Sequence, residues 1–188
     1  MRTTKFTALV TTLAIGFLAC LGGCDTMPNH DFDESPLAEL GELQQSIPAL
    51  EISGEQIAPY SINWHSQEVK ENFNLSGSLP DITVAANTPD FNAKISSRAF
   101  PLSLHVTIFS GGIQTVNPES APAHTYECVS QNCLKQLPDS LELNLDSSAW
   151  GDTVVVSIFA EYWRDPAVAA DEGPTNLVTW VFEYSQAP

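Results

Sequence analysis

The chain has 188 residues and is strongly acidic, with 23 aspartates and glutamates against 7 lysines and arginines and a net charge of −16 at pH 7. This charge argues against a nucleic-acid partner, because phosphate contacts need clustered basic side chains. Anionic lipid headgroups are disfavoured for the same reason, and the acidity itself indicates solubility rather than a particular ligand.

The N-terminal segment has the pattern of an export signal. Two basic residues, an apolar run and a group of residues before a cysteine follow one another in this order: Arg2, Lys5, residues 6–18, Leu21, Gly22, Gly23 and Cys24. The apolar run is shorter than the roughly 20 residues that a membrane-spanning helix needs. We therefore expect residues 1–23 to be a signal peptide.

The end of this segment resembles the lipobox of bacterial lipoproteins, with Leu21, Gly22 and Gly23 directly before Cys24. The resemblance covers residues 1–24 and implies that the preceding residues are removed and that the Cys24 thiol is acylated, for example with palmitate. A cysteine modified in this way carries several acyl chains, and two or more such membrane signals give stable anchoring. The resemblance thus implies a membrane-anchored lipoprotein of the cell envelope that faces the periplasm or the exterior. The alternative is an ordinary secretory signal with an incidental cysteine.

Residues 24–50 are predicted to be a lipidated acidic tether. The sequence has no lysine or arginine from residue 25 to residue 69. Acidic stretches that contain prolines stay extended and do not bury enough apolar surface to fold. Three leucines could line one side of a short helix, but only about two turns are available, so we expect a marginal helix there; they are Leu37, Leu40 and Leu43.

From about residue 57 the apolar residues alternate with polar ones, which is typical of β-strands. Residues 140–146 show this best, because three leucines alternate with three polar residues. Other predicted strands are residues 57–64, 72–79, 81–86, 91–96, 102–109, 124–129, 152–163 and 177–184. Seven to nine short strands without a convincing long helix predict that residues 51–188 form an all-β domain, an antiparallel β-sandwich.

About the last 50 residues resemble the final strands of immunoglobulin-like or fibronectin type III-like domains. The resemblance rests on Leu143 and Leu145, a turn through Trp150 and Gly151, and strands at residues 153–160 and 177–184. It implies an immunoglobulin-like sandwich. The chain lacks the tyrosine of the tyrosine corner and the core cysteine pair around a tryptophan. A lipocalin-like barrel and a jelly roll remain alternatives.

Two cysteines, Cys128 and Cys133, remain once Cys20 and Cys24 are set aside. In an oxidising compartment we expect them to form a disulfide that closes a small loop. A metal site at these thiols would need more ligands than the nearby His124 and Glu127 supply.

The loop at residues 164–176 is the other candidate for ligand chemistry. Asp165, Asp171, Glu172 and Asn176 offer oxygen atoms of the kind that calcium binds. The sequence lacks the D-x-D-x-D-G run of calcium loops, so a solvated loop is the simpler interpretation and we predict no metal and no cofactor. Trp64, Trp150 and Trp163 could stack on a glycan or a partner protein, although tryptophan more often packs in a core.

The sequence contains no catalytic motif such as G-x-S-x-G or H-E-x-x-H. The leading hypothesis is therefore a non-enzymatic envelope lipoprotein whose β-sandwich binds an envelope protein or a glycan, in adhesion or as an accessory subunit of a complex. The alternative is a secreted-type enzyme, such as a polysaccharide hydrolase that uses dispersed carboxylates. A pocket with two convergent carboxylates would favour the enzyme.

Overall fold

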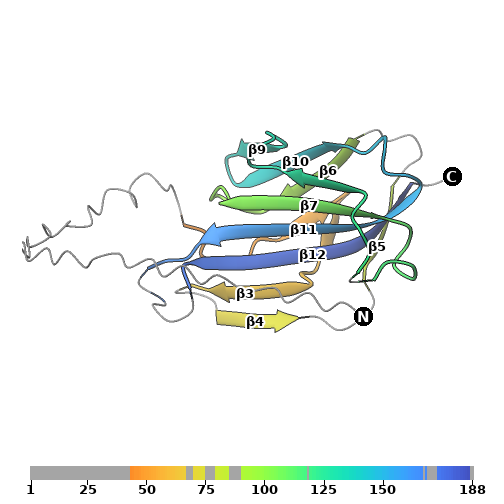
Figure 1. Ribbon diagram of the computed structural model, residues 1–188. Coiled ribbons are helices and arrows are strands. Elements are labelled where there is room, and N and C mark those ends of the chain that lie inside the picture. The colour runs from red at the N-terminus through yellow and green to blue at the C-terminus, as the bar shows by residue number, and fades with distance from the viewer. Residues whose placement is uncertain are drawn as a thin grey trace, which may run out of the picture. The chain divides into compact units, whose positions relative to one another are not determined.

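The computed structural model describes residues 43–66, 70–74, 79–84, 90–117, 119–166, 168 and 173–186. They belong to one compact unit, Ser35–Pro188, and form twelve strands in two sheets (Figure 1). None of the described residues lies in a helix that could cross a membrane. The predicted signal peptide, the predicted lipidation site Cys24, the predicted helix at Leu37–Leu43 (apart from its last residue) and most of the predicted tether lie outside the described residues.

The first sheet has five strands. Their order is β2 (Glu55–Ile57), β1 (Leu50–Ile52), β6 (Asp90–Ile95), β10 (Ser140–Asp146) and β9 (Leu134–Leu137). All four neighbouring pairs are antiparallel. Ser53 and Gly54 join β1 to β2 with φ angles of 53° and 84°, the conformation of a two-residue type I′ hairpin turn.

The second sheet has seven strands, and Figure 1 shows β3, β12, β11 and β7 side by side. Their order is β4 (Lys70–Asn74), β3 (Ser61–His65), β12 (Thr175–Gln186), β11 (Thr153–Trp163), β7 (Ser103–Ser110) and β8 (His124–Glu127). The seventh strand, β5 (Asp81–Val84), pairs with the end of β12 in parallel, while the other pairs are antiparallel.

The strand order is that of an immunoglobulin-like sandwich. The order β1, β6, β10, β9 corresponds to strands A, B, E and D, and β12, β11, β7, β8 corresponds to G, F, C and C′. The chain adds β2 beside β1 and the β3–β4 hairpin beside β12. The predicted antiparallel sandwich is confirmed. The structure has twelve strands rather than seven to nine, because β1, β2 and β9 have only three or four residues and are too short to show alternation.

The core lies between the two sheets, and β11 is its central element. The inward side chains of β11 are fully buried, namely Val154, Val156, Ile158 and Ala160. On its other face Val155 is only 3% exposed. The loop after β7 explains this burial, since it reaches across β11 to β12, where the Ile113 amide donates to Glu183 Oε2 at 2.7 Å. Gly112 permits the close approach, because a Cβ there would lie 2.8 Å from the same oxygen.

Aromatic side chains close the end of the sandwich where β10 is connected to β11. Trp150 in that connection is 3% exposed. Its ring centroid lies 5.2 Å from Phe91 and 5.8 Å from Tyr184, and its Nε1 donates to the Tyr126 hydroxyl at 2.9 Å. Trp150 therefore packs against rings from both sheets, and we call this the aromatic end.

Candidate functional site

Several loops and one terminal segment meet at the other end of the sandwich, which we call the cleft end. They are residues 43–49 before β1, the loop at residues 96–102 between β6 and β7, the turn at residues 138–139 and the chain around Arg164 after β11. In immunoglobulin-like domains this end carries the B–C and F–G loops, which bind ligands in antibody variable domains.

Residues 43–49 cross the cleft end from one sheet to the other. Ser96 N donates to the Ala49 carbonyl at 2.8 Å, and Ala49 N donates to Ser96 Oγ at 2.7 Å. The Gln45 carbonyl accepts from Trp64 Nε1 at 3.3 Å and from Ser66 Oγ at 2.5 Å, which attaches the segment to the end of β3. The packed domain thus includes residues that lie before the boundary at residue 51 placed from the sequence.

A cleft of about 500 Å³ opens between this segment and the neighbouring loops. Its lining residues are Leu43, Gln44, Gln45, Ser46, Ser96, Arg98 and Asp139. The volume lies within the range of small-molecule sites. The lining offers amide groups, hydroxyl groups, one cation and one anion, so the cleft is suited to a polar ligand that carries both charges.

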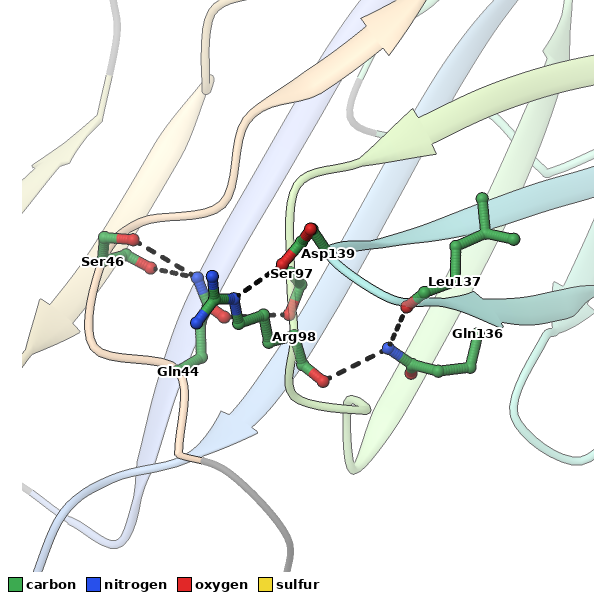
Figure 2. A network of polar contacts seen from close by, with 7 residues as sticks. All are labelled: Gln44, Ser46, Ser97, Arg98, Gln136, Leu137 and Asp139. Atoms are coloured by element: carbon green, nitrogen blue, oxygen red, sulfur yellow. Dashed lines mark hydrogen bonds and ion pairs between the residues drawn. The ribbon is translucent and has the colours of Figure 1, made fainter.

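Gln44 forms the fixed wall of the cleft (Figure 2). Its side chain is largely buried, with 9% of the residue exposed. Its Nε2 donates to the Ser46 carbonyl at 2.8 Å, and its Oε1 accepts from Ser97 Oγ at 3.1 Å. Ser97 Oγ also lies 2.7 Å from the Ala99 carbonyl. These hydrogen bonds fix the wall to the loop that carries Arg98.

Arg98 and Asp139 form an ion pair at the mouth of the cleft, with 3.0 Å between Arg98 Nε and Asp139 Oδ1 (Figure 2). Their side chains are 61% and 75% exposed. An exposed pair of this kind contributes about 0–1 kcal/mol to stability, so the fold does not depend on it. Gln136 Nε2 donates to the Arg98 carbonyl at 3.2 Å and holds the backbone beneath the guanidinium.

Tyr162 lies at the cleft end, in the core between the sheets. Its ring centroid is 5.6 Å from that of Trp64, and both residues are almost fully buried. Burial raises the pKa of Tyr162 to about 12, against a smaller lowering by the Ser97 hydroxyl. The phenol therefore remains protonated at physiological pH and supplies neither a general base nor a charge.

Arg164 fixes the base of the loop between β11 and β12. The residue is 4% exposed, and its Nε donates to Asn176 Oδ1 at 2.9 Å. Further acceptors are the Gly173 carbonyl at 3.0 Å, the Thr175 carbonyl at 2.6 Å and Asn63 Oδ1 at 3.3 Å. Asn176 Oδ1 also accepts from the His65 amide at 2.8 Å. This oxygen, one of the proposed calcium ligands, is thus used in the fold, while Asp171 and Glu172 lie outside the described residues.

Exposed apolar side chains border the cleft end. Among the described residues the large apolar side chains with the greatest exposure are Phe100 at 47%, Tyr60 at 39%, Trp163 at 37% and Leu102 at 36%. Phe100 and Leu102 lie in the loop at residues 96–102, and Leu102 N donates to the Glu161 carbonyl of β11 at 2.8 Å, two residues before Trp163. We call Phe100, Leu102 and Trp163 the apolar rim.

The other residues singled out from the sequence have mostly structural surroundings. Cys128 and Cys133 form the predicted disulfide. Trp64 and Trp150 are buried, so of the three tryptophans considered as stacking surfaces only Trp163 is exposed. Within the described ranges no three His, Cys, Asp or Glu side chains are grouped so that they could hold a metal ion.

No sequence motif indicates the cleft directly. Its groups come from Gln44, Arg98 and Asp139, which are far apart in the chain and meet only because β1 and β10 both pair with β6. The one available signal was Arg98, a rare basic residue in an acidic chain, placed just after a predicted strand.

Comparison with known proteins finds no matching family model, no similar curated protein and no similar solved structure. The described part of the chain is an immunoglobulin-like β-sandwich with a charged cleft at one loop end.

Proposed function

We propose that the protein is a membrane-anchored envelope lipoprotein whose β-sandwich has a non-enzymatic binding role, in adhesion or as an accessory subunit of an envelope complex. The observation that carries the proposal is the succession, in one chain, of a lipobox-like segment ending at Cys24 and an immunoglobulin-like sandwich. In such sandwiches a rigid scaffold presents loops that bind partners. The partner would be another envelope protein or a glycan, reached from the periplasmic or outer side of the membrane.

The make-up of the cleft supports binding over glycoside hydrolysis. Two carboxyl groups flank the bond in most glycosidases, one as acid and one as base or nucleophile. The cleft is lined by one carboxylate, that of Asp139, and this group is paired with Arg98. Acid and base roles would require a second carboxylate, which the lining does not contain.

Lipidation at Cys24 is the first test. Cells that express the protein are labelled with a palmitate analogue, and the purified protein is assayed for the label. We expect the wild type and Cys20→Ser to be labelled and Cys24→Ser to remain unlabelled. Equal labelling of wild type and Cys24→Ser would show that Cys24 is not the lipidated residue.

The binding role is tested by cross-linking in intact cells and isolation of the complexes. Wild type and a variant with both Arg98→Gln and Asp139→Asn are compared, with Lys135→Gln plus Glu142→Gln as the matched control. The control removes another exposed ion pair, 3.6 Å apart, on the surface of the first sheet. We expect defined adducts with the wild type and the control; hydrolysis of envelope polysaccharide by the purified protein would favour the enzyme instead.

A further inference from the structure

The cleft and the apolar rim lie at the end of the sandwich that is connected to the predicted anchor. Residue 43 borders the cleft, and 18 residues separate it from Cys24. A tether of this length spans about 65 Å when fully extended and averages about 23 Å without fixed structure. β12 alone, with 12 residues, is about 40 Å long. The cleft end is therefore the end of the sandwich that is closer to the bilayer on average.

The charges in the cleft match a zwitterionic headgroup. Arg98 and Asp139 hold opposite charges 3.0 Å apart, and both side chains are exposed. A phospholipid headgroup such as phosphoethanolamine can place its phosphate on the guanidinium and its ammonium on the carboxylate through charge-assisted hydrogen bonds. An anionic headgroup such as that of phosphatidylglycerol lacks the ammonium and is repelled by a chain with a net charge of −16.

The apolar rim has the composition of a membrane-interface contact. Single exposed apolar side chains are common on protein surfaces. Here three of the four most exposed large ones in the described part of the chain belong to one end, and they include a tryptophan and a phenylalanine. Tryptophan is enriched at the level of lipid headgroups because its ring is apolar and its N–H is polar.

We propose that the cleft end lies on the surface of the bilayer that holds Cys24, with a zwitterionic phospholipid headgroup in the cleft and the apolar rim at the boundary with the acyl chains. The proposal rests on the proposed lipidation and adds the orientation and the lipid class. The aromatic end then points away from the membrane.

Tryptophan fluorescence tests this orientation, because Trp163 is 37% exposed whereas Trp64, Trp150 and Trp180 are at most 3% exposed. The full lipidated protein is reconstituted into vesicles of phosphatidylethanolamine and brominated phosphatidylcholine. We expect the bromines to quench about a quarter of the total emission, the share of one tryptophan in four. Trp163→Phe should remove the quenchable part, and Phe100→Ser combined with Leu102→Ser should reduce it.

Headgroup recognition is tested in the same vesicles. Arg98→Gln should weaken the quenching, since the charge-assisted bond to the phosphate is lost. Lys135→Gln is the matched control, because it removes an exposed cation that lies on β9 outside the cleft lining. Vesicles of brominated phosphatidylglycerol alone, which contain no zwitterionic headgroup, should also give weaker quenching of the wild type.

The outcomes separate the two proposals. A protein that carries the lipid and floats with the vesicles, but whose Trp163 is not quenched, overturns the membrane-facing orientation and leaves the rim as a surface for a protein partner. Equal quenching of wild type and Arg98→Gln overturns the headgroup assignment. A protein without acyl chains on Cys24 refutes the proposed anchor itself, and the mass of the purified protein shows this directly.

Discussion

The two ends of the sandwich are closed by different chemistry. At the aromatic end, Phe91, Trp150 and Tyr184 fill the space between the sheets with ring contacts of 5.2 to 5.8 Å between centroids. At the cleft end, residues 43–49 cross the opening through hydrogen bonds, and the outermost pair, Arg98 and Asp139, is exposed to solvent. The first end consists of buried apolar surface, whereas the second presents hydrogen-bonded polar groups around a cleft.

This difference separates the residues that stabilise the fold from those that are able to contact a ligand. Burial of large aromatic side chains contributes several kcal/mol in total, while exposed ion pairs contribute about 0–1 kcal/mol each. Groups that contribute little to the fold are able to exchange their partners for a ligand. The cleft end can therefore change its contacts without unfolding the domain, and the aromatic end cannot.

Removal of the Trp150 ring should destabilise the protein by disrupting the packing at the aromatic end. Trp150→Ala deletes a ring that is 3% exposed and contacts Phe91, Tyr126 and Tyr184, so we expect a loss of about 3–5 kcal/mol in the free energy of unfolding. The same substitution at the cleft end, Trp163→Ala, should cost clearly less, because 37% of Trp163 is already exposed in the folded protein. Denaturant unfolding measures both, and similar losses would contradict the contrast between the ends.

The centre of the core provides the reference for both ends. Ile158→Ala truncates a fully buried side chain of β11, the strand between β12 and β7, and should cost about 2–5 kcal/mol. Glu142→Ala, on the outer side of β10, should change stability by less than about 0.5 kcal/mol. If both variants shift the denaturant midpoint equally little, β11 does not hold the sheets together.

The sequence predicted the sandwich because its long strands alternate. The predicted strand at residues 152–163 differs from β11 by one residue, and residues 140–146 coincide with β10. The predicted strand at residues 57–64 was wrong in part, since Ile57 ends β2 and β3 starts at Ser61. Three-residue strands such as β1 and β2 carry too few positions for a period to appear, and their pairing depends on partners elsewhere in the chain.

The cleft was not predictable in the same way. Gln44 and Ser97 are polar residues that ordinary sequence rules place on the surface, yet they are buried because their side chains bond to each other. The Arg98 and Asp139 pair depends on the register between β6 and β10, which no local pattern encodes. The disulfide was predictable, because only two cysteines remained once Cys20 and Cys24 had been assigned to the predicted signal segment.

The buried phenol at the cleft end should make stability depend on alkaline pH. The pKa of Tyr162 rises from 10.0 to about 12 on folding, mainly through burial. Between these values the unfolded chain has lost the proton and the folded protein keeps it, so stability falls as the pH rises, by at most about 1.4 kcal/mol per pH unit. Below pH 10 both forms are protonated and Tyr162 adds no pH dependence.

Denaturant unfolding at several alkaline pH values checks this slope. Tyr162→Phe should reduce it, while a smaller part should remain because burial also raises the pKa of Tyr184. An unchanged slope in Tyr162→Phe would mean that the phenol ionises equally in both states.

The smallest expected effect concerns the hydrogen bonds that fix the wall of the cleft. Ser97→Ala removes a hydroxyl that lies 3.1 Å from Gln44 Oε1 and 2.7 Å from the Ala99 carbonyl, in a residue that is 1% exposed. Because buried acceptors then lack a donor, the variant should lose about 1–2 kcal/mol. Ser130→Ala, which removes an exposed serine hydroxyl, should change stability by less than about 0.5 kcal/mol.

The same variant shows whether residues 43–49 are held at the cleft end by side chains or by the backbone. Ser96 and Ala49 keep their backbone contacts in Ser97→Ala, so β1 should stay protected from amide exchange. The amides around Gln44 should exchange faster than in the wild type, because the anchor of its side chain is lost. Faster exchange throughout β1 would instead show that Ser97 stabilises this whole side of the first sheet. The contacts of the cleft end would then be needed for the fold, like those of the aromatic end.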